Sequence, residues 1–301
     1  MKNLFLYIML LALVPAFMAS CSEDDLSKTS VFSDSTTTKQ NQFDKWLEAN
    51  YVQPYNLEFK YRYVYGESDR DYFTVPAKYE DAVVMAHVIK YIILESYDEA
   101  GGVDFTRKNF PKMIYCIGEF EYRNNGTMVL GTAENGKKIL MTGSNYISKY
   151  QTSISALNKY YLKTIHHEFT HILNQTVDFP ANFKLITADG YVSDSWSTSP
   201  YSDDTYAHQH GFITPYSQHS ATEDFAEMLS VYVTSSKATW NSYIEDAGTN
   251  GAALLNQKLS MVRSYMKDQW NIDIDNLRDI VQRRSADLAA GKVNLTDLSV
   301  K

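Results

Sequence analysis

The segment from Leu157 to Asn174 carries two side-chain stripes at helical spacing. The first stripe is apolar and consists of Leu157, Tyr161, Ile165, Phe169 and Ile172. The second lies beside it and consists of Tyr160, Thr164, His167, His171 and Asn174. Apolar residues that recur every three or four positions predict a helix that packs one face on a core. A histidine face next to that apolar face predicts that the buried helix lines a cleft, and Pro180 is a position that the helix cannot easily pass.

Residues 167–171 have the sequence His-Glu-Phe-Thr-His, which is the pattern H-E-x-x-H. Residues four apart share a helix face, so His167 and His171 can offer imidazole nitrogens to one metal ion. Glu168 can then reach a water molecule on that ion and serve as a general base. The neighbouring His166 lacks a metal-ligating residue four positions later. The alternative interpretation is a surface helix with two solvated histidines and a glutamate.

A catalytic zinc site usually has three protein ligands, and a second predicted helix offers carboxylates for the third position. Glu223 and Glu227 lie four residues apart in Glu-Asp-Phe-Ala-Glu and share a face. The apolar stripe of this helix consists of Phe225, Leu229 and Tyr232. We assign Glu223 as the third ligand and Glu227 as the hydrogen-bond acceptor for the free ring nitrogen of a ligand histidine. Asp224 is the alternative ligand. A solvated acidic helix start, favoured by the helix dipole, would explain Glu223 and Asp224 but not Glu227.

The two motifs together resemble those of the gluzincin metallopeptidases, whose second motif is Glu-x-x-x-Asp or Glu-x-x-x-Glu. Over residues 155–235 the chain resembles more closely the zinc-binding metallopeptidase lipoproteins of Bacteroidetes-type bacteria. The second motif is also similar to that of anthrax lethal factor, in which a tyrosine seven residues before the ligand glutamate helps to stabilise the oxyanion. Tyr216 stands at that position here. The resemblance implies that Tyr216 donates a hydrogen bond to the transition state.

The predicted function is hydrolysis of peptide bonds in a peptide or protein substrate, glycoproteins included, with one Zn²⁺ per chain. Zinc lowers the pKa of a bound water to about 7, and Glu168 would take a proton from that water and pass it to the leaving amine. Tyr216, or otherwise His219 or His210, would donate to the developing oxyanion. The alternative function is a zinc-containing surface lipoprotein that binds glycans or glycoproteins for an uptake system without turnover. Glu168 favours the enzyme, because a binding module needs no general base there.

The N-terminus predicts export and a lipid anchor. Lys2 precedes an apolar run and small residues before Cys21, as in a secretory signal peptide over residues 1–20. The site resembles a bacterial lipobox, which implies that Cys21 is lipidated; an ordinary secretory signal is the alternative. The stretch Ser22-Glu23-Asp24-Asp25 resembles the acidic tag that sends such lipoproteins to the cell-surface side of the outer membrane. A plain hydrophilic tether, with the periplasmic side as location, is the alternative. Residues 21–42 would form a flexible tether, since this Ser/Thr-rich stretch cannot bury a core.

Charge and cysteine content limit the partners. The formal net charge is −8, and it is −9 without residues 1–20, which hold a single lysine. An acidic chain argues against nucleic acid and against an anionic membrane surface, so membrane contact is expected only through the lipid anchor. After Cys21 only Cys116 remains, within a strand-like apolar run. Neither a disulfide nor a cysteine nucleophile is therefore expected.

The remaining pattern predicts one α+β domain over residues 43–301, with a zincin-like fold, a small mixed or antiparallel sheet and a helical C-terminal part. Besides the two motif helices, helices are predicted at 43–52, 76–97, 255–266 and 277–288, and strands at 56–65, 113–120, 127–131 and 137–142. The stretch 127–142 is expected to supply the edge strand above the motif helix, where an extended substrate would add as a further strand. Residues 180–215 are predicted to form a long loop over the cleft, with His208 and His210 facing solvent or its rim.

Overall fold

The computed structural model describes residues 40–69, 71–124, 126–134 and 136–300. The predicted signal peptide and nearly all of the predicted tether therefore lie outside the described residues. None of the helices in the described ranges is long and apolar enough to cross a membrane. The strands are β1 (Glu58–Lys60), β2 (Met113–Cys116), β3 (Glu121–Tyr122), β4 (Met128–Val129), β5 (Gly131–Glu134) and β6 (Lys138–Met141).

Helices make up most of the described chain and differ in their hydrogen-bonding pattern. The α-helices are α2 (Gln42–Leu47), α3 (Gln53–Tyr55), α4 (Tyr79–Val88), α5 (Glu95–Gly101), α6 (Val103–Asn109), α7 (Ile147–Tyr150), α8 (Ile154–Leu157), α9 (Lys163–Thr176), α10 (Asp204–Gln209), α11 (Ala221–Thr234), α12 (Lys237–Asp246), α13 (Gly248–Trp270) and α14 (Ile274–Ala289). Three wider, π-helical stretches are η2 (Glu48–Val52), η4 (Ile89–Leu94) and η6 (Asn158–Leu162). The 3₁₀ turns are η3 (Tyr65–Glu67), η5 (Ser144–Tyr146), η7 (Phe183–Leu185), η8 (Ala188–Gly190), η9 (Ser193–Ser197) and η10 (Pro215–Gln218).

The larger sheet is mixed, with the strand order β1-β2-β6-β5. Strands β1, β2 and β6 are parallel, and β5 is antiparallel to β6. This confirms the predicted α+β class with a small mixed sheet, and it places β5 at an edge, as expected for the stretch 127–142. The predicted strand at 56–65 was too long. Only β1 pairs with a neighbour, because Asn56 ends α3 in a left-handed conformation and the side chain of Tyr65 is exposed.

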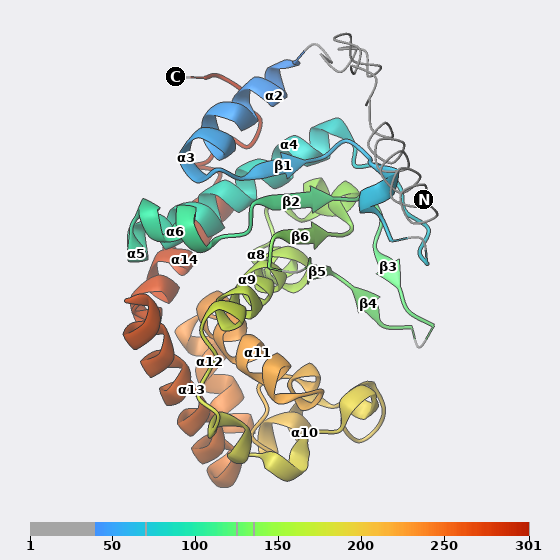
Figure 1. The fold of residues 1–301 in the computed structure, drawn as a ribbon. Helices are drawn as coiled ribbons and strands as arrows, with labels where there is room; N and C mark the ends of the chain where they lie inside the picture. The colour runs from blue at the N-terminus through green and yellow to red at the C-terminus, as the bar shows by residue number, and fades with distance from the viewer. Residues whose placement is uncertain (1–39, 70, 125, 135, 301) are drawn as a thin grey trace, which may run out of the picture. The chain divides into compact units, whose positions relative to one another are not determined.

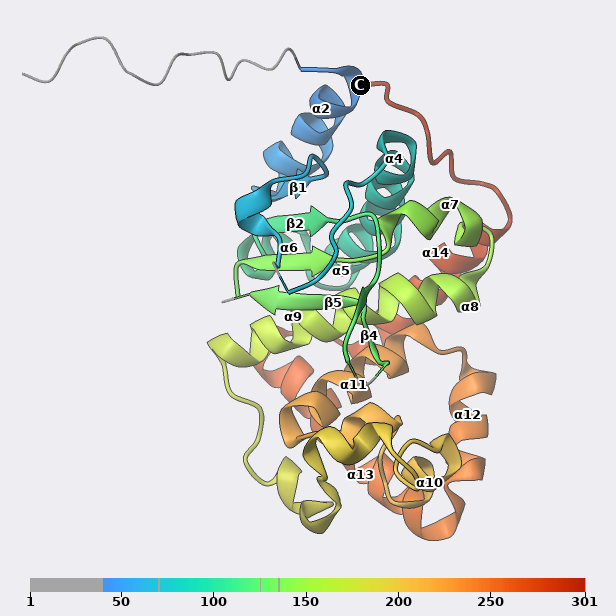
Figure 2. The ribbon, with the colours of Figure 1, turned by 90° about the vertical axis from the view of Figure 1, so that its right-hand side faces the viewer.

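Strands β3 and β4 form a separate two-stranded hairpin. The Asn-Gly signals in the sequence mark this hairpin and the β5–β6 hairpin, and Gly126 and Gly136 take the positive φ that such turns require. The β3–β4 hairpin projects away from the sheet, and Figure 2 shows it passing in front of α9 towards α11. It therefore overhangs the motif helix.

Helix α9 continues from α8 and η6 and lies between the sheet and the C-terminal helices (Figure 1). It packs against β5 on one side and α11 on the other. The predicted apolar stripe is buried, as expected, at Leu157, Tyr161, Ile165, Phe169 and Ile172. Gly131 permits the close approach of β5, since a Cβ there would lie 2.7 Å from the carbonyl oxygen of Leu140 and 2.8 Å from Cγ2 of Thr164. Helices α13 and α14 then pack against α11.

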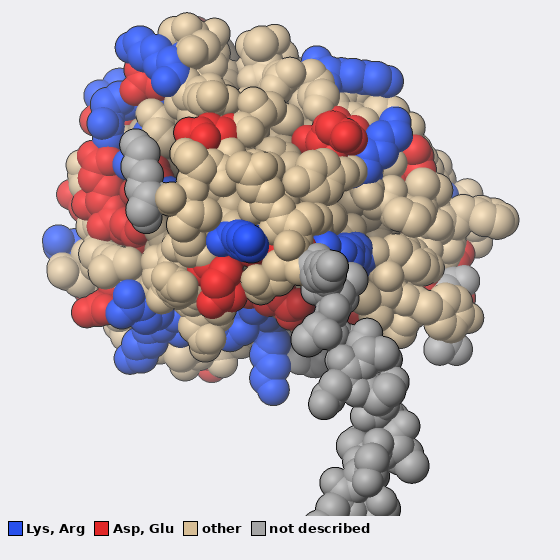
Figure 3. Space-filling view, turned by 90° about the horizontal axis from the view of Figure 1, so that it is seen from above, with Lys and Arg blue, Asp and Glu red and all other residues tan. Residues whose placement is uncertain are grey.

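Residues 180–215 are more ordered than the predicted long loop. They contain the 3₁₀ turns η7, η8 and η9 and the helix α10, which the sequence pattern did not indicate. Phe183 and Phe212 are fully buried, so this segment packs on the core instead of forming a surface excursion. On the face seen in Figure 3, acidic and basic side chains are interspersed and neither sign forms a continuous patch.

Candidate metal centre

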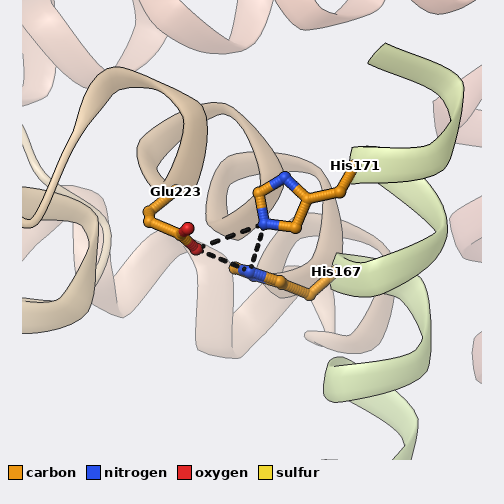
Figure 4. Close-up of side chains that lie close together, drawn as sticks. All are labelled: His167, His171 and Glu223. Carbon is orange, nitrogen blue, oxygen red and sulfur yellow. Dashed lines mark hydrogen bonds and ion pairs between the residues drawn. The ribbon is translucent and has the colours of Figure 1, made fainter. Parts of the chain in front are cut away.

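Helices α9 and α11 bring two histidines and one glutamate together (Figure 4). Nε2 of His167 lies 3.0 Å from Nε2 of His171 and 2.9 Å from Oε2 of Glu223. Nε2 of His171 lies 3.2 Å from the same Glu223 oxygen. Two ligand atoms held at 2.0–2.1 Å by a tetrahedral zinc lie about 3.3 Å apart. The three atoms are therefore within a few tenths of an ångström of that spacing. Among the described residues, these three form the group that could hold a metal ion.

Hydrogen bonding defines which atom of His167 faces the other two groups. Nδ1 lies 2.9 Å from Oε1 of Glu227 and donates to it. In the neutral ring Nε2 is then an acceptor that faces the Glu223 carboxylate, another acceptor, so only the protonated ring can donate to both carboxylates. Burial lowers the pKa of His167, but the hydrogen bonds to Glu223 and Glu227 outweigh burial and raise it to about 10, because a positive charge is favoured between the carboxylates. A metal cation would supply the same positive charge, so the two imidazoles and the carboxylate fit a zinc ion.

Glu227 is held on both sides, by Lys163 and by Thr214. Nζ of Lys163 lies 3.0 Å and 2.9 Å from the two carboxylate oxygens, and the hydroxyl of Thr214 donates to Oε2 at 2.7 Å. Burial raises the pKa of Glu227, but Lys163 and His167 outweigh burial and hold it well below its usual range. Lys163 stands one helical turn before His167, so its spacing was a usable signal. Nothing in the sequence indicated Thr214.

Glu223 occupies the first turn of α11. The helix begins at Ser220, whose hydroxyl accepts a hydrogen bond from the backbone N–H of Glu223 at 3.4 Å. This cap fixes where the first turn starts, and the N-terminal end of a helix favours a carboxylate. Burial raises the pKa of Glu223, but hydrogen bonds to His167 and His171 lower it to well below its usual range. The carboxylate is therefore an anion, as a metal ligand has to be.

Glu168 and Tyr216 lie beside this group without belonging to it. Glu168 is buried, and its carboxylate accepts a hydrogen bond from the backbone N–H of Ala133 in the edge strand β5. Burial raises the pKa of Glu168, an effect that His167 opposes. The ring of Tyr216 lies 6.0 Å from that of His167. Burial, and then the negative charges nearby, raise the pKa of Tyr216, so its hydroxyl stays protonated and can donate.

Two cavities flank the metal centre. One has a volume of about 400 Å³ and is lined by residues of β4, α9 and η10, together with Trp196. The other has a volume of about 560 Å³ and extends past His171 towards Asp178. Glu168, Tyr216 and Arg123 line both cavities. The cavities are therefore two halves of one cleft that passes the metal centre.

The other histidines have partners elsewhere. His166 is buried beside Tyr97, as its unmatched position on α9 suggested. His208 was expected at the surface, but it is buried, since its ring nitrogens bond Asp246 at 2.7 Å and the Ile213 carbonyl at 3.1 Å. His210 is exposed and stacks on Tyr206, and His219 lies 3.4 Å from Asp194. None of these histidines lines the two cavities beside the metal centre.

Asp224, the alternative ligand, faces away from the histidine pair. Its carboxylate lies 2.5 Å from Nζ of Lys258, and both side chains are fully buried. The hydroxyl of Tyr191 donates to the same carboxylate at 3.0 Å, and Lys258 also donates to the carbonyl of Gly211 at 2.7 Å. Asp224 therefore connects the segment before α11 to α13 and contributes no atom to the metal centre.

Replacing Lys258 by methionine is expected to lower the free energy of unfolding by about 3–5 kcal/mol, because Asp224 is left as a buried charge without its cation. Denaturant unfolding measures this change. The matched control is Lys267→Met, an exposed lysine on the same helix, which should stay within about 0.5 kcal/mol of the wild type. Equal unfolding midpoints for the two variants would contradict a structural role for the buried pair.

Comparison with known proteins indicates a zinc-binding protein. The family model described as "Putative zinc-binding metallo-peptidase" matches residues 36–275. A crystal structure from Bacteroides caccae ATCC 43185 with the same description is 36% identical, has a TM-score of 0.73, and matches over 86% of this chain and 96% of its own. None of the curated proteins compared with the chain matches it. The family match spans well over half of the chain and confirms the resemblance carried by the two motifs, so the protein belongs to this zinc-binding metallopeptidase family.

Proposed function

We propose that the protein is a zinc metallopeptidase that hydrolyses internal peptide bonds of extended polypeptide substrates. The observation that supports this most is the position of Glu168. Its buried carboxylate lies beside the His167, His171 and Glu223 group, in a cleft that continues on both sides. A site that only stores zinc has no need for a free carboxylate facing a substrate-sized cavity.

In this proposal His167, His171 and Glu223 hold the zinc, and Glu227 orients His167. Zinc, when bound, polarises the scissile carbonyl and makes a water molecule a nucleophile at neutral pH. Glu168 takes the proton of the attacking water on a carboxylate oxygen and later gives it to the nitrogen of the leaving amine. Tyr216 donates its hydroxyl proton in a hydrogen bond to the carbonyl oxygen as negative charge develops there.

The edge strand β5 is proposed to bind the substrate backbone. Thr142 N–H donates to the Leu130 carbonyl at 3.2 Å, so the polar groups of Leu130 point towards β6. Alternation along an antiparallel pair then directs the backbone groups of Gly131 and Ala133 to the open side. Ala133 follows this rule, since its N–H bonds Glu168. A substrate strand added there, antiparallel to β5, passes directly over the general base.

The length of the cleft supports cleavage within a chain. With an antiparallel substrate, residues before the scissile bond occupy the cavity near His171, and residues after it occupy the cavity beside β4. The second cavity adjoins a further one of about 470 Å³, since Lys163, Asp204 and Thr214 line both. An enzyme that binds a chain terminus needs a cleft that is closed on one side of the metal centre. This cleft continues on both sides.

We also propose that Cys21 carries a lipid that anchors the protein to the outer membrane, with the catalytic unit exposed at the cell surface. This proposal is supported by the sequence pattern of residues 1–25 alone. Under it, the residues between Cys21 and the start of α2 serve as the tether, and peptides or proteins, glycoproteins included, reach the cleft from outside.

The test is a combined metal and cleavage assay on purified residues 22–301. We expect about one zinc per chain and cleavage of peptides that are blocked at both ends, because an internal bond needs no free terminus. A chelator should stop the cleavage, and added zinc should restore it. A protein without zinc, or a zinc-loaded protein that cleaves no member of a proteome-derived peptide library, would contradict the proposal.

A further inference from the structure

Arg123 stands out among the cleft residues because it comes from the β3–β4 hairpin, which passes in front of the motif helix α9 (Figure 2), and lines the cavities beside the metal centre. The hairpin backbone holds it in place, since its N–H donates to the Thr127 carbonyl at 2.9 Å and its own carbonyl accepts from Gly126 at 2.9 Å. Its side chain is exposed and lines both halves of the cleft. Tyr216 lines the same two cavities, so both side chains face the part of the cleft next to the metal centre.

No acidic side chain among the described residues pairs with Arg123. Across the described residues, no ion pair or side-chain hydrogen bond involves its guanidinium, whereas Lys163 is paired with Glu227. A zinc ion in the metal centre would balance the charges of Glu168 and Glu223. Asp204 also lines the cavity beside β4, but it is exposed at the start of α10 and belongs equally to the adjoining cavity. Among the described residues that line the two cavities, Arg123 is therefore a cation without a paired carboxylate.

The cavity beside β4 is suited to the side chain that Arg123 would bind. Val129 and Pro215 provide apolar walls, and Trp196 adds an aromatic one that meets Tyr216 edge-on at 5.0 Å. Such walls accommodate an aliphatic stem. A guanidinium at the mouth recognises a carboxylate by two parallel hydrogen bonds, and arginine favours that geometry over lysine.

We propose that Arg123 is a specificity-determining residue that binds the carboxylate of an acidic side chain on the residue directly after the scissile bond. The position follows from the hairpin, because Thr127, opposite Arg123, lines the cavity for residues after the bond and is not part of the other cavity. This inference rests on the proposed function and deepens it. The substrates would be extended chains with glutamate or aspartate downstream of the cleaved bond.

The experiment compares peptides that differ only at that residue, which is Glu, Gln or Lys. We expect the wild type to favour Glu over Gln by about tenfold in kcat/KM, since a hydrogen bond to a charged group contributes enough to change an equilibrium tenfold. The effect should lie mainly in KM, because the contact forms equally in the ground state and in the transition state. Arg123→Gln should remove the preference, and Arg123→Glu should shift it to Lys.

Two controls make the result specific. Lys159→Gln removes an exposed cation that lines only the adjoining cavity, and it should keep the preference for Glu. Zinc content should be equal in all variants, because Arg123 contributes no metal ligand. Retention of the preference in Arg123→Gln, or a preference that acts at the residue before the bond, would overturn the inference.

Binding measured without turnover separates this inference from the proposed function. The same fluorescent peptides are titrated into zinc-loaded Glu168→Gln protein, with and without the added Arg123→Gln change. Tighter binding of the Glu peptide that depends on Arg123 supports the inference even when the wild type cleaves nothing, an outcome that would refute only the peptidase proposal. Equal binding of the Glu and Gln peptides overturns the inference, whatever the cleavage assay shows.

Discussion

Replacing Glu168 by glutamine is expected to abolish measurable peptide cleavage while the protein keeps its zinc. Glutamine has nearly the same volume and can still accept from the Ala133 N–H, so β5 and α9 should remain in place. It cannot take a proton from water, and the loss of a general acid–base group costs about 10²–10⁴-fold in rate. Because Glu168 is not among the three convergent ligand atoms, zinc affinity should be unchanged.

Cleavage of a blocked fluorogenic peptide and metal analysis of the same preparation provide the measurement. Glu168→Ala should behave in the same way, whereas Glu80→Gln, an exposed change on α4, should match the wild type. A Glu168→Gln protein that cleaves at the wild-type rate would show that another group moves the proton. A variant that loses both zinc and activity would place Glu168 among the ligands.

Replacing Glu223 by alanine is expected to weaken zinc binding by more than about 100-fold. Loss of a residue that only hydrogen-bonds a metal ligand weakens metal affinity by up to about 100-fold, and loss of a ligand itself should weaken it more. The change removes the carboxylate oxygen that lies 2.9 Å and 3.2 Å from the two imidazole nitrogens. Two histidines then remain, fewer than the three protein ligands of ordinary zinc sites. Competition with a chromophoric chelator measures the affinity.

The neighbouring residue is the matched control. Asp224→Asn should retain zinc with near wild-type affinity but unfold at lower denaturant concentration, because Lys258 loses its buried counter-charge. The two changes therefore separate metal binding from stability within one helical turn. Tight zinc binding by Glu223→Ala, together with loss of zinc from Asp224→Asn, would move the ligand to Asp224.

The motif helices could be predicted from the sequence because their spacing encodes geometry. Residues four apart share a face, so His167 and His171 had to point the same way, and Glu223 had to share its face with Glu227 and not with Asp224. The apolar stripe of α9 determined which side would be buried. For these elements the local pattern and the tertiary structure agree.

Features that depend on distant contacts could not be predicted in this way. Alternating residues at 56–65 look like a strand over their whole length, yet only the part that finds β2 as a neighbour is paired. His208 stands in a polar stretch, and only the fold brings Asp246 to it. Thr214 and Arg123 reach the cleft from connecting segments, whose paths are set by the packing of β3, β4 and η10 and not by any local period.

The convergence of α9 and α11 on one group of metal ligands has a consequence for the stability of the protein. His167 and Glu223 are 56 residues apart in sequence and lie on α9 and α11, which pack on each other. A metal ion bound by both residues therefore cross-links the two helices. A ligand that binds only the native state stabilises it by an amount that grows with its free concentration. A low zinc concentration in the surroundings would therefore lower the stability of the fold as well as the activity. The zinc-free form would be the one most easily degraded by other proteases.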